Sequence, residues 1–315
     1  MTLYVFNPEH DICLANGDAH FVPPQTALRF ARRGCNVMRW LSSEPDKALC
    51  CPADGVGELL AQYPDIDAIV PWGWDAALGT VLRKQGVPDA LLPSEEQLQQ
   101  WRQLQHRTTP LGLFPTEAVA AFSVEEVQDF LSQHHNIILK APWSGSGQGI
   151  RPVRDSLTQH DMGWIANICR RQSCVIAEPR YDVVQDFALE FEVGDMVSLT
   201  GYSLFHTQGG AYQYNELLCD EEILARIEAY GLRNDVVSAG QRITAWAETH
   251  VAGCYHGPMG VDMFVYRQSG GYALCPMCEI NFRHTMGLVA HEYLRHNPSC
   301  HGQRFSPFQE CVARL

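Results

Sequence analysis

The segment at 137–150, IILKAPWSGSGQGI, carries the residues best suited to bind an anion. Lys140 ends an apolar run, and three glycines follow at alternate positions, Gly145, Gly147 and Gly149. Backbone N–H groups converge most easily on an anion where no Cβ interferes, and a lysine adds a mobile positive charge. The sequence after Gly149 predicts a second strand, so we expect a hairpin flap that closes over phosphate groups. An ordinary flexible polar hairpin is the alternative.

Lysine usage supports the phosphate interpretation. The chain has 23 basic residues, and its lysines are Lys47, Lys84 and Lys140. In a chain so rich in arginine, a lysine beside a glycine-rich loop is unlike generic surface charge. The loop differs from the Walker A and dinucleotide-binding motifs, which need other glycine spacings and a following helix. The sequence therefore predicts a phosphate loop of another kind.

A second group of chemically useful residues lies on two predicted strands nearer the C-terminal end. Asp262 lies on the first strand, and Glu279 and Asn281 lie on the second. Side chains two residues apart share one face of a strand, so Glu279 and Asn281 point the same way, and Arg283 continues that face if the strand persists. Carboxylate and amide oxygens suit Mg²⁺ that carries nucleotide phosphates. A solvated strand face is the alternative, but charged groups on packed strands need a partner.

With both groups in one chain, the sequence resembles the ATP-grasp superfamily over about residues 94–290. Lys140 and its glycines resemble the mobile phosphate loop, the stretch 175–193 resembles the hinge strand and the strand after it, and EINFR at 279–283 resembles the Glu-x-Asn-x-Arg signature. The three motifs occur in the expected order, which is more specific than any single motif. The resemblance implies an α/β protein with the ATP-grasp fold, preceded by a small parallel α/β (Rossmann-like) unit.

The resemblance also implies roles for individual residues. Lys140 and the three loop glycines would hold the phosphates of ATP. Glu178 would contact adenine, the backbone of Arg180 and Tyr181 would line the base pocket, and Asp186 would meet the ribose hydroxyls. Mg²⁺, or alternatively Mn²⁺, would be held by Asp262, Glu279 and Asn281. Arg283 would face the reacting carboxylate or acyl phosphate.

One feature departs from the family pattern. The family usually carries an earlier lysine about one helix before the phosphate loop, and no lysine lies between Lys84 and Lys140. His106 and Arg107, at the end of a helix predicted at 95–106, occupy the corresponding position. Arg107 can bind an α-phosphate there, with a geometry that differs from that of lysine.

Strand and helix signals divide the chain into three parts. Short buried strands are predicted at 3–6, 36–40 and 67–71, and a helix at 25–33 lies between the first two. Alternation of strands and helices implies a parallel sheet. We expect an α/β unit at 1–93, a lid lobe with the phosphate loop at 94–177, and a second lobe with the hinge and the metal site at 178–315. Further helices are predicted from Ser94 and Ser123, where capping boxes fit, and at 220–230 and 234–249.

Several other segments allow more than one interpretation or suggest no specific role. Asn7–Asp11 and Trp72–Asp75 follow predicted strands, where open α/β sheets bind ligands, but capping and turn chemistry explain them equally well. The polar segment 205–215 is either a substrate loop or an ordinary hairpin. Cys275 and Cys278 form a lone C-x-x-C, which fits a packed strand better than a redox or metal site. Cys50 and Cys51 precede Pro52 in a predicted loop with no specific role.

Composition indicates a globular cytoplasmic enzyme. The chain has 315 residues, 46% hydrophobic and 19% charged, which is enough for two or three subdomains. Its sequence has no secretory leader pattern and no apolar run as long as a membrane span. The net charge of −13 argues against nucleic acid as the main partner. The 12 cysteines follow no regular framework, so we expect buried, reduced thiols.

The function implied by the resemblance is that of an ATP-dependent ligase. It would join a small carboxylate, such as an amino acid or a peptide-like acid, to an amine or similar nucleophile, and release ADP and phosphate from an acyl-phosphate intermediate. Its partners would be these small molecules, and a homodimer is possible. The alternatives are a small-molecule kinase on the same scaffold and a nucleotide-binding regulatory protein with little turnover. The sequence does not identify either substrate.

Overall fold

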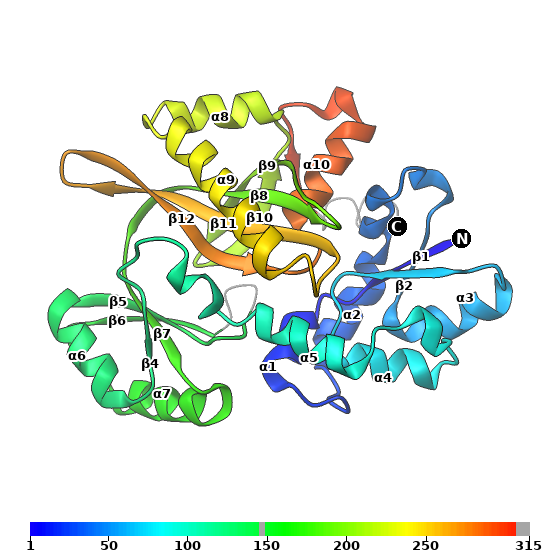
Figure 1. Ribbon diagram of the computed structural model, residues 1–315, viewed down its shortest axis with the longest axis horizontal. Coiled ribbons are helices and arrows are strands. Elements are labelled where there is room, and N and C mark those ends of the chain that lie inside the picture. Colours follow the sequence, from blue (N-terminus) through cyan, green and yellow to red (C-terminus); the bar gives the residue numbers. More distant parts are fainter. Residues whose placement is uncertain (145–148, 307–315) are drawn as a thin grey trace.

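The computed structural model describes residues 1–144 and 149–306. These residues form three β-sheets with helices packed against them, an α/β architecture as predicted. In Figure 1 the N-terminal sheet lies at the right, a small sheet lies at the lower left, and the largest sheet lies above and between them. This arrangement brings segments from both ends of the chain beside the largest sheet.

The N-terminal sheet is parallel, with β1 (Thr2–Phe6) between β2 (Leu49–Pro52) and β3 (Ala68–Pro71). The predicted helix at 25–33 is confirmed as α2 (Gln25–Gly34). The other helices of this region are α1 (His10–Asn16), α3 (Val56–Gln62) and α4 (Ala76–Lys84). The predicted small parallel α/β unit is therefore present.

The strand predicted at 36–40 is wrong. Residues Cys35–Leu41 form the 3₁₀ helix η1, and the missing strand is β2, which contains the two cysteines expected in a loop. Val37, Met38 and Trp40 are all buried, in a cluster with residues of the C-terminal helix region. Apolar positions at i, i+1 and i+3 suit a helical turn better than a strand, whose side chains alternate between faces.

The small sheet is antiparallel, in the order β4 (Val119–Ala121), β7 (Val175–Pro179), β5 (Asn136–Lys140) and β6 (Ile150–Arg154). It shares a core with α6 (Val124–His134) and α7 (Gln159–Gln172), which lie below the sheet in Figure 1. Ser123 caps α6 as predicted, because its hydroxyl accepts the N–H of Glu126. The expected pair of strands around the glycine-rich segment is confirmed, although Gly145 and Gly147 lie outside the described residues.

The largest sheet has six strands, in the order β12, β11, β8, β9, β10 and β13. Their bounds are Asp182–Val193 (β8), Val197–Gln208 (β9), Ala211–Glu216 (β10), Gly257–Gln268 (β11), Gly271–Asn281 (β12) and Arg304–Phe305 (β13). The helices α8 (Asp220–Glu228) and α9 (Arg233–His250) are close to the predicted ranges. Phe187, Leu189 and Phe191 of β8 join the core with them, so the alternate residues of β8 face the opposite side of the sheet.

Two further helices connect the parts. The predicted capping box of Ser94 and Gln97 is present at α5 (Glu95–Leu104), which ends two residues before the predicted end. Leu98 and Trp101 of α5 pack into the core of the largest sheet. The last helix is α10 (Met286–His296). Short 3₁₀ turns occur at Pro45–Lys47, Ala53–Gly55, Asp89–Leu91, Thr109–Gly112 and Pro298–Cys300.

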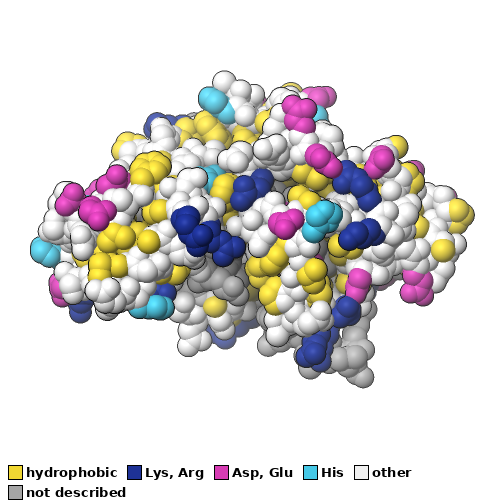
Figure 2. Space-filling view, turned by 90° about the horizontal axis from the view of Figure 1, so that it is seen from below, with side chains coloured by type: hydrophobic (Ala, Val, Ile, Leu, Met, Phe, Trp, Pro, Cys, Tyr) yellow, Lys and Arg dark blue, Asp and Glu magenta, His cyan; other side chains and the backbone are white. Residues whose placement is uncertain are grey.

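The described parts of the chain contain neither a disulfide nor a helix suited to span a membrane. On the face shown in Figure 2, as far as described residues form it, basic and acidic side chains are interspersed with apolar ones. Each described cysteine is a free thiol. None of the helices in the described parts of the chain is both long and apolar enough to cross a membrane.

Candidate active site

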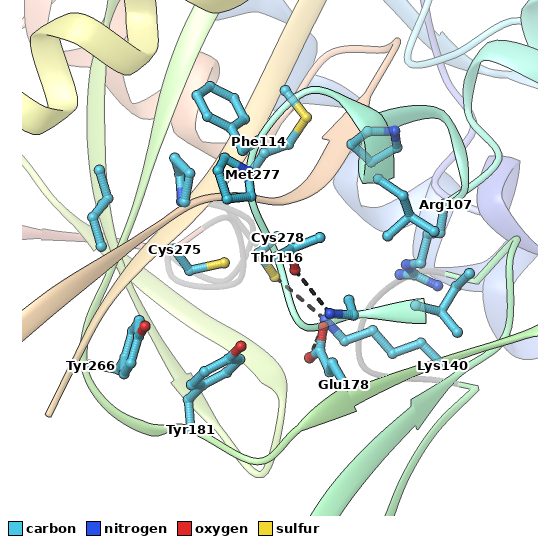
Figure 3. A pocket seen from close by; sticks show the side chains of 17 residues that line it. Arg107, Phe114, Thr116, Lys140, Glu178, Tyr181, Tyr266, Cys275, Met277 and Cys278 are labelled. Atoms are coloured by element: carbon cyan, nitrogen blue, oxygen red, sulfur yellow. Dashed lines mark hydrogen bonds and ion pairs between the residues drawn. The ribbon is translucent and has the colours of Figure 1, made fainter. Parts of the chain in front are cut away.

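A cavity of about 70 Å³ lies between the small sheet and β12, and we call it the Lys140 cavity (Figure 3). Its walls come from the chain after α5, from β5 and β7, and from the paired strands β11 and β12. The lining residues include Arg107, Phe114, Lys140, Glu178, Tyr181, Tyr266, Cys275, Met277 and Cys278. Aromatic and apolar side chains form one wall, and charged side chains gather at the other end.

Lys140 and Glu178 form an ion pair at the charged end of this cavity. Lys140 Nζ lies 2.6 Å from Glu178 Oε1, and both side chains are largely buried. The ammonium also lies 3.6 Å from Cys278 Sγ. Burial disfavours the charged ammonium, but Cys278 and Glu178 outweigh this and raise the pKa of Lys140. The side chain therefore stays protonated at neutral pH, with Glu178 as its present partner.

The apolar wall is built around Tyr181. Its ring lies 4.5 Å from that of Tyr266 and 5.5 Å from that of Phe264, measured between ring centroids. Cys275 belongs to the same wall, and burial raises the pKa of its thiol to about 11. A thiol that stays protonated packs as an apolar group, as the packed-strand interpretation expected. Arg180 is exposed outside the lining, and its backbone N–H donates to the carbonyl of Asn136.

Arg107 follows α5 and crosses from the start of the glycine-rich segment to β12. Its guanidinium donates to the carbonyl oxygens of Ala141, at 2.6 Å, and Ser144, at 2.9 Å. It also donates to Glu279 Oε1 at 2.6 Å. The side chain is 5% exposed, so these bonds are shielded from water. Arg107 thus links the predicted phosphate loop to a predicted metal ligand.

The glycine at the end of the loop has a steric role. Gly149 has φ +73°, and an added Cβ would lie 2.7 Å from the Cβ of Ser144. Its carbonyl oxygen accepts the N–H of Ala141 at 2.8 Å, which closes the base of the β5–β6 hairpin. A larger residue at Gly149 would distort this closure.

A larger cavity of about 360 Å³ lies beyond Glu279, and we call it the Asp262 cavity. Asp262 on β11 lies directly opposite Glu279 on β12, and Asn281 Nδ2 lies 3.4 Å from Asp262 Oδ2. The structure therefore brings together the three predicted metal ligands. Burial, together with the neighbouring carboxylates Glu279 and Glu190, raises the pKa of Asp262. Within the described parts of the chain, no basic side chain forms an ion pair with Asp262.

These three residues fit a divalent metal ion. All three offer hard oxygen donors, and the half-buried carboxylate of Asp262 forms no ion pair among described residues, although Arg283 lowers its pKa from a greater distance. Glu279 accepts from Arg107 through Oε1 and has a second carboxylate oxygen to offer to an ion. A cation at this position would offset the repulsion that raises the pKa of Asp262.

Arg283 lies after the end of β12 and not on it, so the predicted strand does not persist this far. Its guanidinium makes a two-pronged ion pair with Asp11 of α1, at 3.0 and 3.1 Å. Arg283 overcomes the effect of burial and lowers the pKa of the Asp11 carboxyl. Both residues line the Asp262 cavity, so Arg283 faces the cavity from a fixed position.

Asp186 lies on β8 and accepts a hydrogen bond from the Thr207 hydroxyl at 2.9 Å. Burial raises the pKa of its carboxyl. It belongs to the lining of neither cavity, whereas Thr207 lines the Asp262 cavity. Its predicted contact with a ribose stays a prediction.

In the segments Asn7–Asp11 and Trp72–Asp75, some residues act as caps and others line a cavity. Asp75 caps α4 by accepting the N–H of Leu78, and its other oxygen lies 3.2 Å from His10 Nδ1. Asp11 and Trp72, in contrast, line the Asp262 cavity. The segment 205–215 is a hairpin formed by β9 and β10, and it also lines this cavity through several residues, namely Phe205, Thr207, Gly210, Ala211, Tyr212 and Asn215.

Sequence reasoning missed Glu190. This residue lies on β8 with 1% exposure and lines the Asp262 cavity. Its oxygens accept hydrogen bonds from the hydroxyls of Ser203, at 2.9 Å, and Thr285, at 2.8 Å. The available signal was its position four residues after Asp186 on a strand, which puts both on one face.

Comparison with solved structures identifies the fold. A biotin carboxylase from Campylobacter jejuni, in complex with β-γ-ATP, matches 93% of this chain and 67% of its own at 12% identity, with a TM-score of 0.54. N5-carboxyaminoimidazole synthetase from Staphylococcus aureus, complexed with ADP, matches 97% of this chain and 78% of its own at 13% identity, with a TM-score of 0.52. The match with D-cycloserine synthetase DcsG covers 94% of this chain and 98% of the synthetase at 15% identity, with a TM-score of 0.51.

The chain has the ATP-grasp fold, as the motifs predicted. No protein-family model matches the sequence. No curated protein is significantly similar to it. The shared fold covers nearly the whole chain, including the N-terminal parallel sheet, so the expected fold class is confirmed over that length.

Proposed function

We propose that the protein is an ATP-dependent ligase that joins a small carboxylate to an amine or similar nucleophile and releases ADP and phosphate. One observation carries this proposal: the two cavities adjoin at the ion pair of Arg107 and Glu279. A cavity with a buried lysine and an aromatic wall therefore meets a larger cavity at a set of hard oxygen ligands. Phosphoryl transfer from a nucleotide to a second substrate needs this juxtaposition.

The Lys140 cavity suits the nucleotide. Tyr181 and the apolar residues around it offer a flat surface for a base, and Lys140 offers a charge for phosphate oxygens. Lys140 would exchange Glu178 for phosphate on binding, since the two charges now satisfy each other. The structures of the biotin carboxylase and of the synthetase from Staphylococcus aureus contain β-γ-ATP and ADP, respectively, which supports nucleotide binding by this fold.

Asp262, Glu279 and Asn281 would hold Mg²⁺. When bound, the ion supplies positive charge that neutralises the phosphate oxygens during transfer. Arg107 holds Glu279 in place through a buried bond and so orients one member of the set. Arg283, oriented by Asp11, would stabilise negative charge that develops on the carboxylate and on the acyl phosphate.

The chemistry would proceed in two displacements. A carboxylate oxygen attacks the γ-phosphorus of ATP, and the bond to the bridging oxygen breaks, with ADP as the leaving group. The amine then attacks the carbonyl carbon of the acyl phosphate, a C–N bond forms, and phosphate departs. The nitrogen loses its proton to solvent or to a carboxylate.

A pairwise screen of amino acids, short peptides and small carboxylates for ADP release tests this proposal. We expect ADP release that requires both a carboxylate and an acceptor, and that is strongly reduced in Asp262→Asn. ADP release with a single substrate and a stable phosphorylated product would favour a kinase. Binding of ATP without turnover in any combination would favour a regulatory protein.

A further inference from the structure

We propose that Glu190 binds a protonated amino group of the substrate, and that this substrate also carries an apolar side chain. The inference rests on the proposed function, because it assigns the Asp262 cavity to the substrates of the ligase. It goes further by naming the charge and polarity of one of them. Glu190 would therefore be a specificity-determining residue.

The surroundings of Glu190 leave capacity for a ligand. An ionised carboxylate offers about four acceptor sites on its two oxygens. One hydroxyl reaches each oxygen, Ser203 on Oε1 and Thr285 on Oε2. Burial raises the pKa of Glu190, and these two hydrogen bonds oppose the rise. The carboxylate is thus fixed in orientation while acceptor sites remain.

Glu190 forms no ion pair among the described residues, although Arg283 and His291 lower its pKa from a greater distance. Arg283 is held by Asp11 in a two-pronged pair, and His291 lies beside Glu292 and Asp220. No described basic side chain forms an ion pair with Glu190 itself. A buried carboxylate is costly unless it is paired, so an ammonium group of a ligand would stabilise it.

Two glycines keep the carboxylate in this position. A Cβ on Gly287, in the first turn of α10, would lie 2.1 Å from Glu190 Oε1. A Cβ on Gly260, the β11 partner of Glu190, would lie 2.5 Å from Thr285 Cγ2 and 3.1 Å from Glu190 Oε2. Any side chain at either position would push against the group of Glu190, Ser203 and Thr285. The local sequence therefore favours one placement of this charge.

Part of the cavity wall is apolar and aromatic. Its walls include Phe30, Trp72, Phe205, Tyr212 and Met286. With a volume of about 360 Å³, the cavity has room for an amino-acid derivative with a large side chain. A ligand with an ammonium group and an apolar group can contact both Glu190 and this wall, whereas a ligand without either group can contact neither in this way.

Binding of amines and of their uncharged isosteres tests this proposal. The pairs are phenylalaninamide with 3-phenylpropanamide, leucinamide with 4-methylpentanamide, and alaninamide with propanamide, each titrated calorimetrically without nucleotide. We expect at least one amine with an apolar side chain to bind about tenfold or more tightly than its isostere, the scale of one charged hydrogen-bonded contact. Alaninamide and propanamide should bind most weakly of the three pairs, since both lack the large apolar group.

Variants then locate the preference. Glu190→Gln should bring the amine and its isostere to within about twofold, while Glu192→Gln, an exposed position on the same strand, should leave the preference intact. Glu190→Met is the second variant, because an apolar group of similar length often replaces a buried charge without loss of stability. Circular dichroism and melting curves check that each variant is folded.

Two results would overturn the inference: no amine preferred over its isostere in the natural protein, or an undiminished preference in both Glu190 variants. Neither result depends on ATP, so it differs from a failure of the proposed ligase function. That failure would appear as an absence of ADP release with any pair of substrates. A preserved amine preference beside absent ADP release would support the binding role alone.

Discussion

The two cavities of this protein balance their charges in opposite ways. In the Lys140 cavity, the charged groups are paired with each other, Lys140 with Glu178 and Arg107 with Glu279. In the Asp262 cavity, Glu190 is buried and Asp262 is half-buried, yet neither forms an ion pair within the described residues. Burial raises the pKa of both carboxyls, because no ion pair offsets the loss of hydration.

The difference indicates two modes of binding. A phosphate that enters the Lys140 cavity must displace a carboxylate that already satisfies the lysine. A cation that enters the Asp262 cavity completes a set of charges that the protein leaves uncompensated. Substitutions in the two cavities should therefore fail in different ways, and four experiments test this contrast.

The largest effect is expected for Asp262→Asn. The amide keeps the shape of the side chain but loses the charge that would hold Mg²⁺. Because a metal ion contributes several kcal/mol to phosphoryl transfer, we expect turnover to fall by about 10²–10³-fold. Steady-state ADP release measures this, with Asp182→Asn, an exposed residue at the start of β8, as the control. Near-normal turnover in Asp262→Asn would remove the metal assignment, and Glu279→Gln should behave like Asp262→Asn.

Lys140→Ala should weaken ATP binding by about 1–3 kcal/mol, the range for losing a hydrogen-bond partner. Calorimetric titration measures the affinity, and Lys84→Ala, at an exposed position, is the control. The variant should also melt at a lower temperature, because Glu178 loses its partner. Adding Glu178→Gln should restore the melting temperature without restoring ATP affinity. An unchanged ATP affinity in Lys140→Ala would contradict the phosphate assignment.

Asp11→Asn should lower kcat by about tenfold while ATP affinity stays the same. The amide still accepts a hydrogen bond from Arg283, but the charge-assisted, two-pronged pair is lost, and one such weakened contact is worth about 1.4 kcal/mol. Separate measurements of kcat and of the ATP dissociation constant distinguish this positioning role from a nucleotide contact. A change confined to ATP affinity would contradict it.

The pH dependence of stability should report the uncompensated charge of Asp262. Because its pKa is raised in the folded state, the folded protein holds this proton at pH values where the unfolded chain has lost it. The carboxyl group therefore lowers the free energy of unfolding as pH rises above about 4, the ordinary carboxyl pKa. Relative to Asp262→Asn, we expect the free energy of unfolding of the metal-free natural protein to fall by on the order of 1 kcal/mol. The fall should occur between about pH 4 and the raised pKa of Asp262.

Urea unfolding of both proteins at a series of pH values measures this difference. Saturating Mg²⁺ should reduce it, since the ion takes the place of the proton. A difference that is flat with pH, or that grows in the opposite direction, would show that the Asp262 carboxyl is compensated after all.

The sequence predicted those parts of the molecule that depend on short spacings. Glu279 and Asn281 are two residues apart on one strand, and Lys140 is followed at once by its glycines, so their local geometry follows from the chain. The order of these motifs was enough to predict the ATP-grasp fold. The ligand roles of these residues remain predictions for the experiments above.

What the sequence did not predict depends on pairings between distant segments. Asp11 and Arg283 are 272 positions apart, and Arg107 and Glu279 are 172 apart. Glu190 and Thr285, whose side chains are hydrogen-bonded beside the Asp262 cavity, are 95 positions apart. Residues 36–40 were mistaken for a strand because they are largely apolar, although the spacing of Val37, Met38 and Trp40 suits a helical turn.

The most direct test of the central claim is a phosphorus NMR spectrum of a complete reaction with ATP, Mg²⁺ and a pair of substrates found by the screen. If the two cavities act as one ligase site, the spectrum should show ADP and inorganic phosphate in equal amounts. Hydroxylamine in place of the acceptor should still release ADP and should trap a hydroxamate of the carboxylate. AMP and pyrophosphate in that spectrum would contradict the account, because attack would then occur at the α-phosphorus.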